Sequence, residues 1–423
     1  MLTRLTEHVY LGDAGDGPAM MEAGATRLFD LRGEVSPPRY RVPVEHFPLE
    51  DLRYGQHEML LAAARRLRDL VRDGETVGVY CQAGVSRTAA VAILYLMLEG
   101  RSRSEATRLL RLSRPEALPA VLLERCLVEL EQELPLMPAT WSMEVAGVRV
   151  AGVHRPGDGP PLVLLHGAYG DWTHWMRNLD GLSAGADVYA LDLPGFGSSD
   201  DLGGEFDYGR YLDFLAEAIS RLKPGPVVVG GYSFGAALAA RLALHAPERV
   251  RAAVLVSLVG RTGDPATHHP IDERHFTSSM TLAERWSVLA DNLRRWHVAE
   301  PGLVDDRAVA MTYKSVFFTR LTPRRLRAAS QPLPILEVVE QLRRRPLLMV
   351  WGARDAFCQP SAAVWAAACR RVNPGLESVI LEDAGHWCQF ERPQAFTDAV
   401  NAFLGRLDSC DFGLEEGGRG IGR

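Results

Sequence analysis

The sequence lacks a long apolar segment and an excess of charge of either sign. The longest apolar run, at residues 89–98, is far shorter than the ~20 residues that span a bilayer, so it predicts a buried helix. The first ten residues lack the apolar core of a signal peptide. The net charge of −6 creates no field that would attract nucleic acid or anionic lipid. We therefore expect a cytoplasmic protein with no membrane span and no nucleic-acid partner.

Cysteine and lysine are scarce as well. Lysine occurs only at positions 223 and 314, and this preference for arginine is typical of a GC-rich, bacterial genome. The cysteines follow neither a disulfide framework nor the spacing of zinc ligands; they are Cys81, Cys126, Cys358, Cys369, Cys388 and Cys410. This predicts a reducing compartment. The 423 residues, 47% of them apolar, are enough for two or three globular domains.

The chain changes character at a proline-containing break, residues 135–141, which we interpret as a linker. Residues 1–134 alternate short strands and amphipathic helices, and residues 142–407 do so more regularly. The second pattern predicts a mostly parallel sheet with helices on both faces. We expect strands near residues 28–31 and 77–80, a hairpin near 145–153, and further strands near 162–165, 188–191, 227–229, 253–256, 347–350 and 377–381.

Residues 257–342 interrupt the regular alternation of the second domain. They are rich in arginine and aromatic side chains and mainly helical in pattern, so we expect a helical lid inserted between two late strands. Residues 408–423 are rich in glycine and predict a flexible tail. The overall expectation is therefore an α/β domain followed by a larger, lidded α/β domain.

The first chemical motif is a Cys-x5-Arg loop at residues 81–87, between an apolar strand and a helix. Backbone N–H groups and a helix N-terminus in such a loop bind an anion and favour the thiolate of Cys81 as a nucleophile. Arg87 can hold two phosphate oxygens, and Gly84 lets the backbone approach them. The predicted phosphate-binding residues are Gln82, Ala83, Gly84, Val85, Ser86, Arg87 and Thr88.

Displacement at phosphorus also requires an acid that protonates the leaving oxygen. Asp51, in the sequence Pro-Leu-Glu-Asp-Leu-Arg, is the best candidate, and the neighbouring Glu50 is a weaker one. Because Arg87 is the only basic residue of the loop, we expect a simple phosphomonoester rather than a polyphosphorylated substrate.

These motifs carry a family resemblance. Residues 1–134 resemble the dual-specificity phosphatases of the protein tyrosine phosphatase superfamily, through residues 8–12, the Asp51 loop, residues 81–88, residues 94–97 and residues 104–115. The resemblance implies a phosphocysteine intermediate, with Cys81 as nucleophile, Arg87 as phosphate clamp, Asp51 as general acid and Thr88 assisting departure of the thiolate. Tyr80 stands where the family usually has histidine. The alternative is a domain that binds phosphate without turning it over.

The second motif is Gly-Tyr-Ser-Phe-Gly at residues 231–235, between an apolar strand and an alanine-rich helix. This is the context of a nucleophile elbow at Ser233. Asp355 and His386 follow later strands, which completes the order Ser, Asp, His; Asp264 is an alternative acid. The backbone N–H groups of Ala168 and Phe234 are expected to form the oxyanion hole.

Residues 141–407 resemble the α/β-hydrolase superfamily, through the elbow, the triad order and the segments 165–169, 192–198 and 390–396. A serine nucleophile argues against the epoxide hydrolases and haloalkane dehalogenases of that superfamily. Carboxylesterases, thioesterases, lactonases and C–C bond hydrolases remain open.

We therefore predict a bifunctional hydrolase, with a cysteine-dependent phosphatase fused to a serine hydrolase. Neither mechanism needs a metal or an organic cofactor, so we expect none. The expected partners are a small acyl substrate and a phosphomonoester or phosphoprotein. One alternative makes the first domain a phosphate-binding module that regulates an esterase. Another makes the hydrolase a scaffold, blocked by its lid, beside a working phosphatase.

Overall fold

The computed structural model describes residues 2–134, 139–259, 271–275, 277, 280–329 and 333–409. Its contacts divide the chain into two compact units. The first unit comprises Met1–Met137, Glu273–Arg294 and Pro301–Phe318, and the second comprises Pro138–Asp272, Arg295–Glu300 and Thr319–Arg423. Both units are built on an α/β plan, which confirms the predicted fold class. The domain limits at residues 134 and 407 stay predictions.

The first unit has a five-stranded sheet in which β5 lies in the middle and is parallel to both of its neighbours. The strand order is β1-β2-β5-β3-β4. The strands are β1 (Thr3–Thr6), β2 (Val9–Gly12), β3 (Arg27–Arg32), β4 (Val44–Leu49) and β5 (Val77–Tyr80). The sequence predicted β3 and β5, whereas β1, β2 and β4 were missed.

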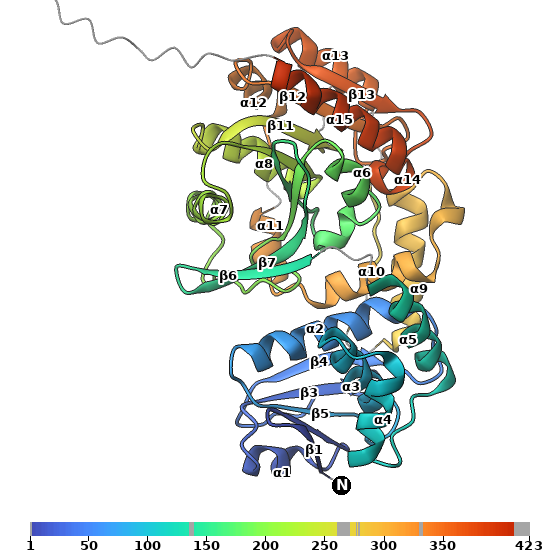
Figure 1. Cartoon of the computed structure of the whole chain (residues 1–423). Helices are drawn as coiled ribbons and strands as arrows, with labels where there is room; N and C mark the ends of the chain where they lie inside the picture. Colours follow the sequence, from blue (N-terminus) through green and yellow to red (C-terminus); the bar gives the residue numbers. More distant parts are fainter. Residues whose placement is uncertain are drawn as a thin grey trace, which may run out of the picture. The chain divides into compact units, whose positions relative to one another are not determined.

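Helices cover this sheet on two sides, with α1 and α2 on opposite sides of the blue strands in Figure 1. Met20 of α1 packs with Leu28 and Tyr80 on one face of the sheet. The apolar run at residues 89–98 falls in α3, which is buried along its length as predicted. The helices are α1 (Gly17–Glu22), α2 (His57–Arg72), α3 (Arg87–Leu98), α4 (Arg103–Ser113) and α5 (Val121–Glu133).

Two helices from the expected lid, α9 (Leu282–Asn292) and α10 (Asp306–Phe317), belong to the first unit. In α10, the Lys314 Nζ atom lies 3.6 Å from Oε2 of Glu58, a residue of α2 that is only 3% exposed. Arg307 of α10 lies 3.7 Å from Glu58 and 2.8 Å from Glu133. The amphipathic pattern correctly predicted helices here, but it does not reveal which surface their apolar faces cover.

The second unit has an eight-stranded sheet of order β13-β12-β11-β10-β8-β9-β7-β6. The strands from β13 to β9 are parallel, and β7 is antiparallel to both β9 and β6. The predicted hairpin is present, although it is longer than expected and turns at Ala146 and Gly147. The strands are β6 (Ala139–Val145), β7 (Val148–Arg155), β8 (Pro161–Leu165), β9 (Asp187–Asp192), β10 (Val227–Tyr232), β11 (Val250–Val256), β12 (Leu347–Gly352) and β13 (Glu377–Leu381).

Both faces of the middle strands are buried, as the continuous apolar runs predicted. In β10, Val227 and Val229 join one large core, while Val228 between them is also fully buried and points to the other face. The large core includes side chains of α7, α8, α12 and α13. The helices are α6 (Leu179–Ser183), α7 (Tyr208–Leu222), α8 (Phe234–His245), α11 (Pro323–Ala329), α12 (Ile335–Gln341), α13 (Ala362–Val372), α14 (Cys388–Glu391) and α15 (Pro393–Ser409).

Three short helical turns occur outside these α-helices. Trp172–Trp175 forms a 3₁₀ turn after β8, and Leu293–His297 forms a π-helical turn that follows α9. A further 3₁₀ turn, Pro301–Leu303, precedes α10 in the chain. Among the described residues, no helix has both the length and the apolar character needed to cross a membrane.

Replacing Lys314 with methionine is expected to destabilise the first unit by about 3 kcal/mol, because Glu58 would lose one partner of a buried ion pair. Arg307 remains near Glu58, which places the expected loss at the low end for such pairs. Amide hydrogen exchange in α2 and α10 measures the change. The control Arg72→Gln removes an exposed ion pair with Glu99 and should cost no more than about 0.5 kcal/mol. Equal exchange in the two variants would contradict the prediction.

Candidate active sites

The cysteine loop joins the middle strand of the first sheet to helix α3. Cys81 follows directly after β5, and Arg87 is the first residue of α3. Three loop carbonyl groups accept hydrogen bonds from outside the loop: Gln82 from the N–H of Ala14, Gly84 from Nε of Arg114, and Val85 from the N–H of Leu118. In a trans peptide the next N–H points the opposite way. The N–H groups of Ala83, Val85 and Ser86 therefore face the centre of the loop, which suits an anion.

Gly84 allows the tight path of this loop. Its φ is +68°, and a Cβ atom there would lie 2.7 Å from the carbonyl oxygen of Gly12. The hydroxyl oxygen of Thr88, at the other end of the loop, is buried without a hydrogen-bond partner among the described residues. A donor in this place is suited to a thiolate or a phosphate oxygen.

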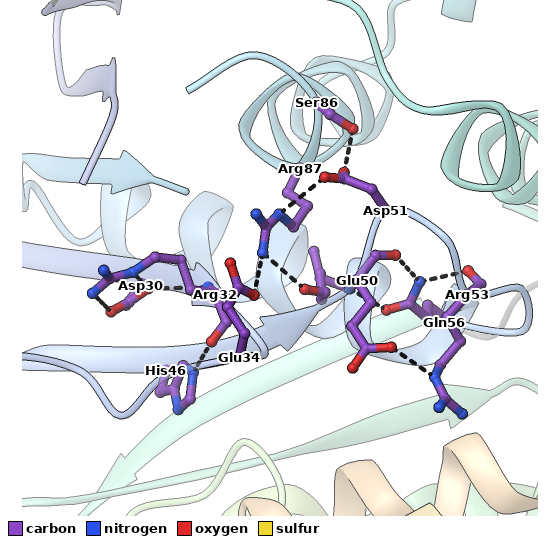
Figure 2. A network of polar contacts seen from close by, with 11 residues as sticks. Asp30, Arg32, Glu34, His46, Glu50, Asp51, Arg53, Gln56, Ser86 and Arg87 are labelled. Atoms are coloured by element: carbon purple, nitrogen blue, oxygen red, sulfur yellow. Dashed lines mark hydrogen bonds and ion pairs between the residues drawn. The ribbon is translucent and has the colours of Figure 1, made fainter. Parts of the chain in front are cut away.

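Arg87 is 6% exposed and lies in the polar network of Figure 2. It donates from Nη1 to Oε2 of Glu34 at 2.6 Å, and its Nε lies 3.7 Å from Oδ2 of Asp51. Partial burial opposes ionisation of Glu34, but the bond and charge of Arg87 outweigh it and lower the pKa of Glu34. Glu34 was not predicted as a site residue, because nothing in its sequence spacing indicates that it contacts Arg87.

The two candidate acids occupy different surroundings. Asp51 accepts a hydrogen bond of 2.5 Å from Oγ of Ser86, so it lies at the cysteine loop. Glu50 instead pairs with Arg53, with Nε and Oε2 3.1 Å apart. The side chain of Gln56 bonds the main chain of Glu50 twice and that of Arg53 once, at 2.7–2.8 Å, and so fixes the segment between them. This geometry favours Asp51 over Glu50 as the acid.

Tyr80, before the cysteine, is fully buried. Burial and the nearby charge of Asp30 raise the pKa of Tyr80, so the phenol stays neutral. The carboxylate of Asp30 accepts two hydrogen bonds from the guanidinium of Arg32, at 2.9 and 2.7 Å (Figure 2). The chain therefore supplies no positive charge at the position where histidine is usual.

In the second unit, Ser233 lies at a sharp turn between β10 and α8, with φ 52° and ψ −112°. Such a conformation is strained for a residue with a side chain. Two glycines make the turn possible: a Cβ on Gly231 would lie 2.1 Å from the carbonyl oxygen of Gly235, and one on Gly235 would lie 2.2 Å from that of Leu165. The small residues of the motif are thus required by the backbone of the elbow.

Ser233, Asp355 and His386 come together as one hydrogen-bonded chain. Nε2 of His386 lies 3.0 Å from Oγ of Ser233, and Nδ1 lies 2.9 Å from both carboxylate oxygens of Asp355. His386 is 2% exposed and Asp355 is 7% exposed. Oγ of Ser257 donates to the carbonyl of His386 at 2.7 Å, which fixes the histidine main chain. Asp264, the alternative acid, lies outside the described residues.

The expected oxyanion turn lies against the elbow, since a Cβ atom on Gly235 would clash with the carbonyl oxygens of Leu165 and His166. The N–H of Leu193 donates to Nε2 of His166, so its Nδ1 carries the proton and donates to the carbonyl of Gly167 at 2.7 Å. Complete burial lowers the pKa of His166 to about 4, which keeps it neutral. This arrangement orients the turn that carries Ala168.

Phe234 contributes the other expected donor of the oxyanion hole. It directly follows Ser233 and is the first residue of α8, so its N–H lies at the positive end of the helix. The structure thus brings the elbow, the Ala168 turn and the triad to one edge of the sheet.

Two further residues at this site were not predicted. Glu391, 4% exposed, accepts bonds from the N–H groups of Gly385 at 2.6 Å and Ala299 at 2.7 Å. Burial raises the pKa of Glu391. The ring of His297 lies 5.8 Å from that of His386, between centroids. Both contacts arise from tertiary structure, and no spacing in the sequence could have indicated them.

Among the described residues, no group of three or more His, Cys, Asp or Glu side chains is arranged to hold a metal.

The elbow, triad and sheet define an α/β hydrolase. Residues 162–399 match the alpha/beta hydrolase family, and residues 33–133 match the catalytic domain of the dual specificity phosphatases. The chain belongs to the alpha/beta hydrolase family and carries a phosphatase-type domain ahead of its hydrolase domain. The two resemblances inferred from the sequence are thereby confirmed, and so is the assignment to the hydrolases.

Curated relatives match about three fifths of the chain. The chain is 30% identical over 270 residues to a pimeloyl-[acyl-carrier protein] methyl ester esterase of Aeromonas hydrophila, which covers 60% of this chain and 98% of that protein. It is 28% identical over 275 residues to the dihydrolipoyllysine-residue acetyltransferase component of the acetoin cleaving system of Pseudomonas putida, covering 63% of this chain and 70% of that protein.

Solved structures support the fold. A meta-cleavage product hydrolase from Pseudomonas fluorescens has a TM-score of 0.51 and 22% identity, with 63% of this chain and 98% of that chain covered. A bacterial membrane phospholipase A has a TM-score of 0.50 and 21% identity, with coverage of 69% and 97%. At these identities the likeness extends to the fold alone.

Cys81 is expected to react fastest with iodoacetamide at neutral pH among the five described cysteines. Burial raises the pKa of Cys369 to about 11 and that of Cys388 to about 12, and it also raises the pKa of Cys126 and Cys358. Those four thiols therefore stay protonated, whereas Cys81 is the expected nucleophile and lies beside the inward N–H groups of the loop. Peptide mass spectrometry measures each rate separately.

Inorganic phosphate should slow this alkylation by occupying the loop, and Arg87→Met should remove the protection. All five described cysteines are buried, so equal alkylation of Cys81 and the other four thiols, with no effect of phosphate, would contradict an anion-binding loop.

Proposed function

We propose that this chain combines two hydrolytic activities. The second unit hydrolyses a carboxylic ester or a related acyl compound through Ser233, and the first hydrolyses a phosphomonoester through Cys81. The observation that carries the proposal is the hydrogen-bonded chain from Ser233 through His386 to Asp355. The relatives that cover this part of the chain include a methyl ester esterase, and they support an ester as the substrate class.

The esterase reaction follows from the triad geometry. His386 Nε2, 3.0 Å from Ser233 Oγ, takes the hydroxyl proton as the serine attacks the acyl carbon. Asp355 holds the proton on Nδ1 and balances the charge of the imidazolium. The N–H groups of Ala168 and Phe234 stabilise the oxyanion. His386 then returns the proton to the leaving alcohol, and a water activated by the same histidine releases the acid.

The phosphatase reaction uses the loop of the first unit. The Cys81 thiolate attacks phosphorus while Arg87 and the inward N–H groups hold the phosphate oxygens. Asp51, which lies beside Ser86 and Arg87, protonates the leaving oxygen. In the second step Asp51 takes a proton from the water that hydrolyses the phosphocysteine. A reducing compartment such as the bacterial cytoplasm suits this thiolate chemistry, and the five described cysteines are all unpaired.

One observation favours a second candidate function for the first unit. Arg87 is already paired with Glu34 at 2.6 Å, and a neutral tyrosine precedes the nucleophile. Both features weaken the activation of a thiolate and suit a domain that binds phosphate without turnover. The first unit then acts as a phosphate-binding regulator of the esterase.

The esterase proposal predicts that wild-type protein hydrolyses p-nitrophenyl acetate and reacts with a fluorophosphonate probe. Ser233→Ala should abolish probe labelling and lower kcat by about 10,000-fold or more, because the nucleophile is lost. Cys388→Ala, which alters a buried residue near the triad without touching Ser233, should leave labelling intact. Failure of well-folded wild-type protein to label would favour the lid-blocked scaffold.

The phosphatase proposal predicts turnover of p-nitrophenyl phosphate that vanishes in Cys81→Ser. Asp51→Asn should lower kcat by about 100-fold through loss of the general acid, whereas the matched Glu50→Gln should have a much smaller effect. Phosphate binding without turnover in the wild type, measured by calorimetry, would instead establish the binding module.

A further inference from the structure

Within the expected lid, consecutive segments of the chain belong alternately to the first and the second unit. Glu273–Arg294 and Pro301–Phe318 belong to the first unit, and Arg295–Glu300 between them belongs to the second. A six-residue segment of the hydrolase site is therefore attached at both ends to helices that are part of the phosphatase-type unit. Its first residues lie in the π-helical turn Leu293–His297, a local distortion that is frequent at functional sites.

Within the second unit, this segment is bonded to the loop that carries the catalytic histidine. The N–H of Trp387, the residue after His386, donates to the carbonyl of His297 at 2.7 Å. The carboxylate of Glu391 joins the segment to the histidine loop. One of its oxygens accepts a hydrogen bond from the N–H of Gly385, and the other accepts one from the N–H of Ala299. A shift of the segment would therefore shift the loop of His386.

The ring of His297 makes a second connection to the triad. Its centroid lies 5.8 Å from that of His386 and 5.2 Å from that of Phe357. The Phe357 ring lies 4.4 Å from His386. The three rings form one cluster, so the side chain of His297 restricts the orientation of the catalytic imidazole, both directly and through Phe357.

Within the first unit, the flanking helices contact the segment that carries Asp51. The guanidinium of Arg53 lies 4.8 Å from the ring of Trp286 in α9. A Cβ atom on Gly55 would lie 3.1 Å from Cβ of Asp306 in α10. Gln56 bonds the main chain of this segment internally, so it can move as one piece. Asp51 in turn lies beside Ser86 and Arg87.

We propose that His297 is a positioning residue for His386, and that phosphate bound at Arg87 controls hydrolase turnover through it. This inference rests on the proposed function of the second unit. A phosphate dianion competes with Asp51 for Arg87 and repels the carboxylate, which displaces the segment at Arg53 and Gly55. The displacement passes through α9 and α10 to the main chain on either side of Arg295–Glu300.

The direction of the effect follows from the structure. In the structure, His386 lies at hydrogen-bond distance from both Ser233 and Asp355. Any displacement of His297 from this arrangement weakens the hydrogen bonds of the triad. Phosphate is therefore an inhibitor of the hydrolase, although it binds in the other unit.

The experiment measures the rate at which a fluorophosphonate labels Ser233 in the full chain, with and without saturating inorganic phosphate. In the wild type we expect phosphate to slow labelling at least about fivefold, which is the low end of usual coupling between sites. Arg87→Met should abolish the phosphate effect by removing the anion clamp. Arg72→Gln, at the exposed end of α2, should retain it.

His297 variants test the route. His297→Ala should lower kcat for p-nitrophenyl acetate about tenfold with little change in KM, because the imidazole is less well oriented, and should abolish the phosphate effect. His297→Phe restores a ring against Phe357 and should recover most of kcat. This recovery separates a positioning role from a general loss of structure.

Two results would overturn the inference: wild-type labelling that does not respond to phosphate, or a phosphate effect that persists in His297→Ala. Absence of labelling in the wild type, by contrast, would overturn the proposed esterase itself. The two failures are therefore distinguishable in the same assay.

Discussion

One buried carboxylate, that of Glu58, determines to which of the two units helix α10 belongs. Glu58 is 3% exposed on α2, and its charge is balanced by Lys314 and Arg307 of α10. A buried charge without partners costs several kcal/mol, so this pairing commits α10 to the first unit. Lys314 is one of only two lysines in the chain. The insertion is therefore shared along the sequence, because Arg295–Glu300 belongs to the second unit.

The two candidate active sites use the same local design on separate sheets. In each, a buried strand ends in a tight turn made possible by glycine, and a helix begins at once: α3 after Cys81 and α8 after Ser233. The proposed nucleophile thus lies at the helix N-terminus, where partial positive charge favours negative charge on the reacting atoms. The remaining groups differ because phosphorus and carbon require different partners.

Much of this could be predicted from sequence, because Ser233, Asp355 and His386 all follow parallel strands whose carboxyl ends share one edge. Local patterns do not report tertiary partners, so Glu34, His297 and Glu391 were missed. Strand β4 was missed as well, because Pro48 interrupts its pattern; a proline is tolerated there since β4 lies at the sheet edge. The helices α9 and α10 were predicted as helices, but their amphipathic faces do not identify the unit on which they pack.

The division of the insertion has a consequence for synthesis on the ribosome. Domains generally fold from the N-terminus as they emerge, yet the first unit requires residues up to Phe318. Until then α2 lacks the helix that balances Glu58 and covers Phe47, whose ring lies 5.3 Å from Phe318. Most of the hydrolase sheet is synthesised during this interval. The phosphatase-type unit therefore stays partly uncovered until α10, which is encoded within the hydrolase part of the sequence, has been synthesised. A gene fragment that ends at the linker would encode this unit without α9 and α10.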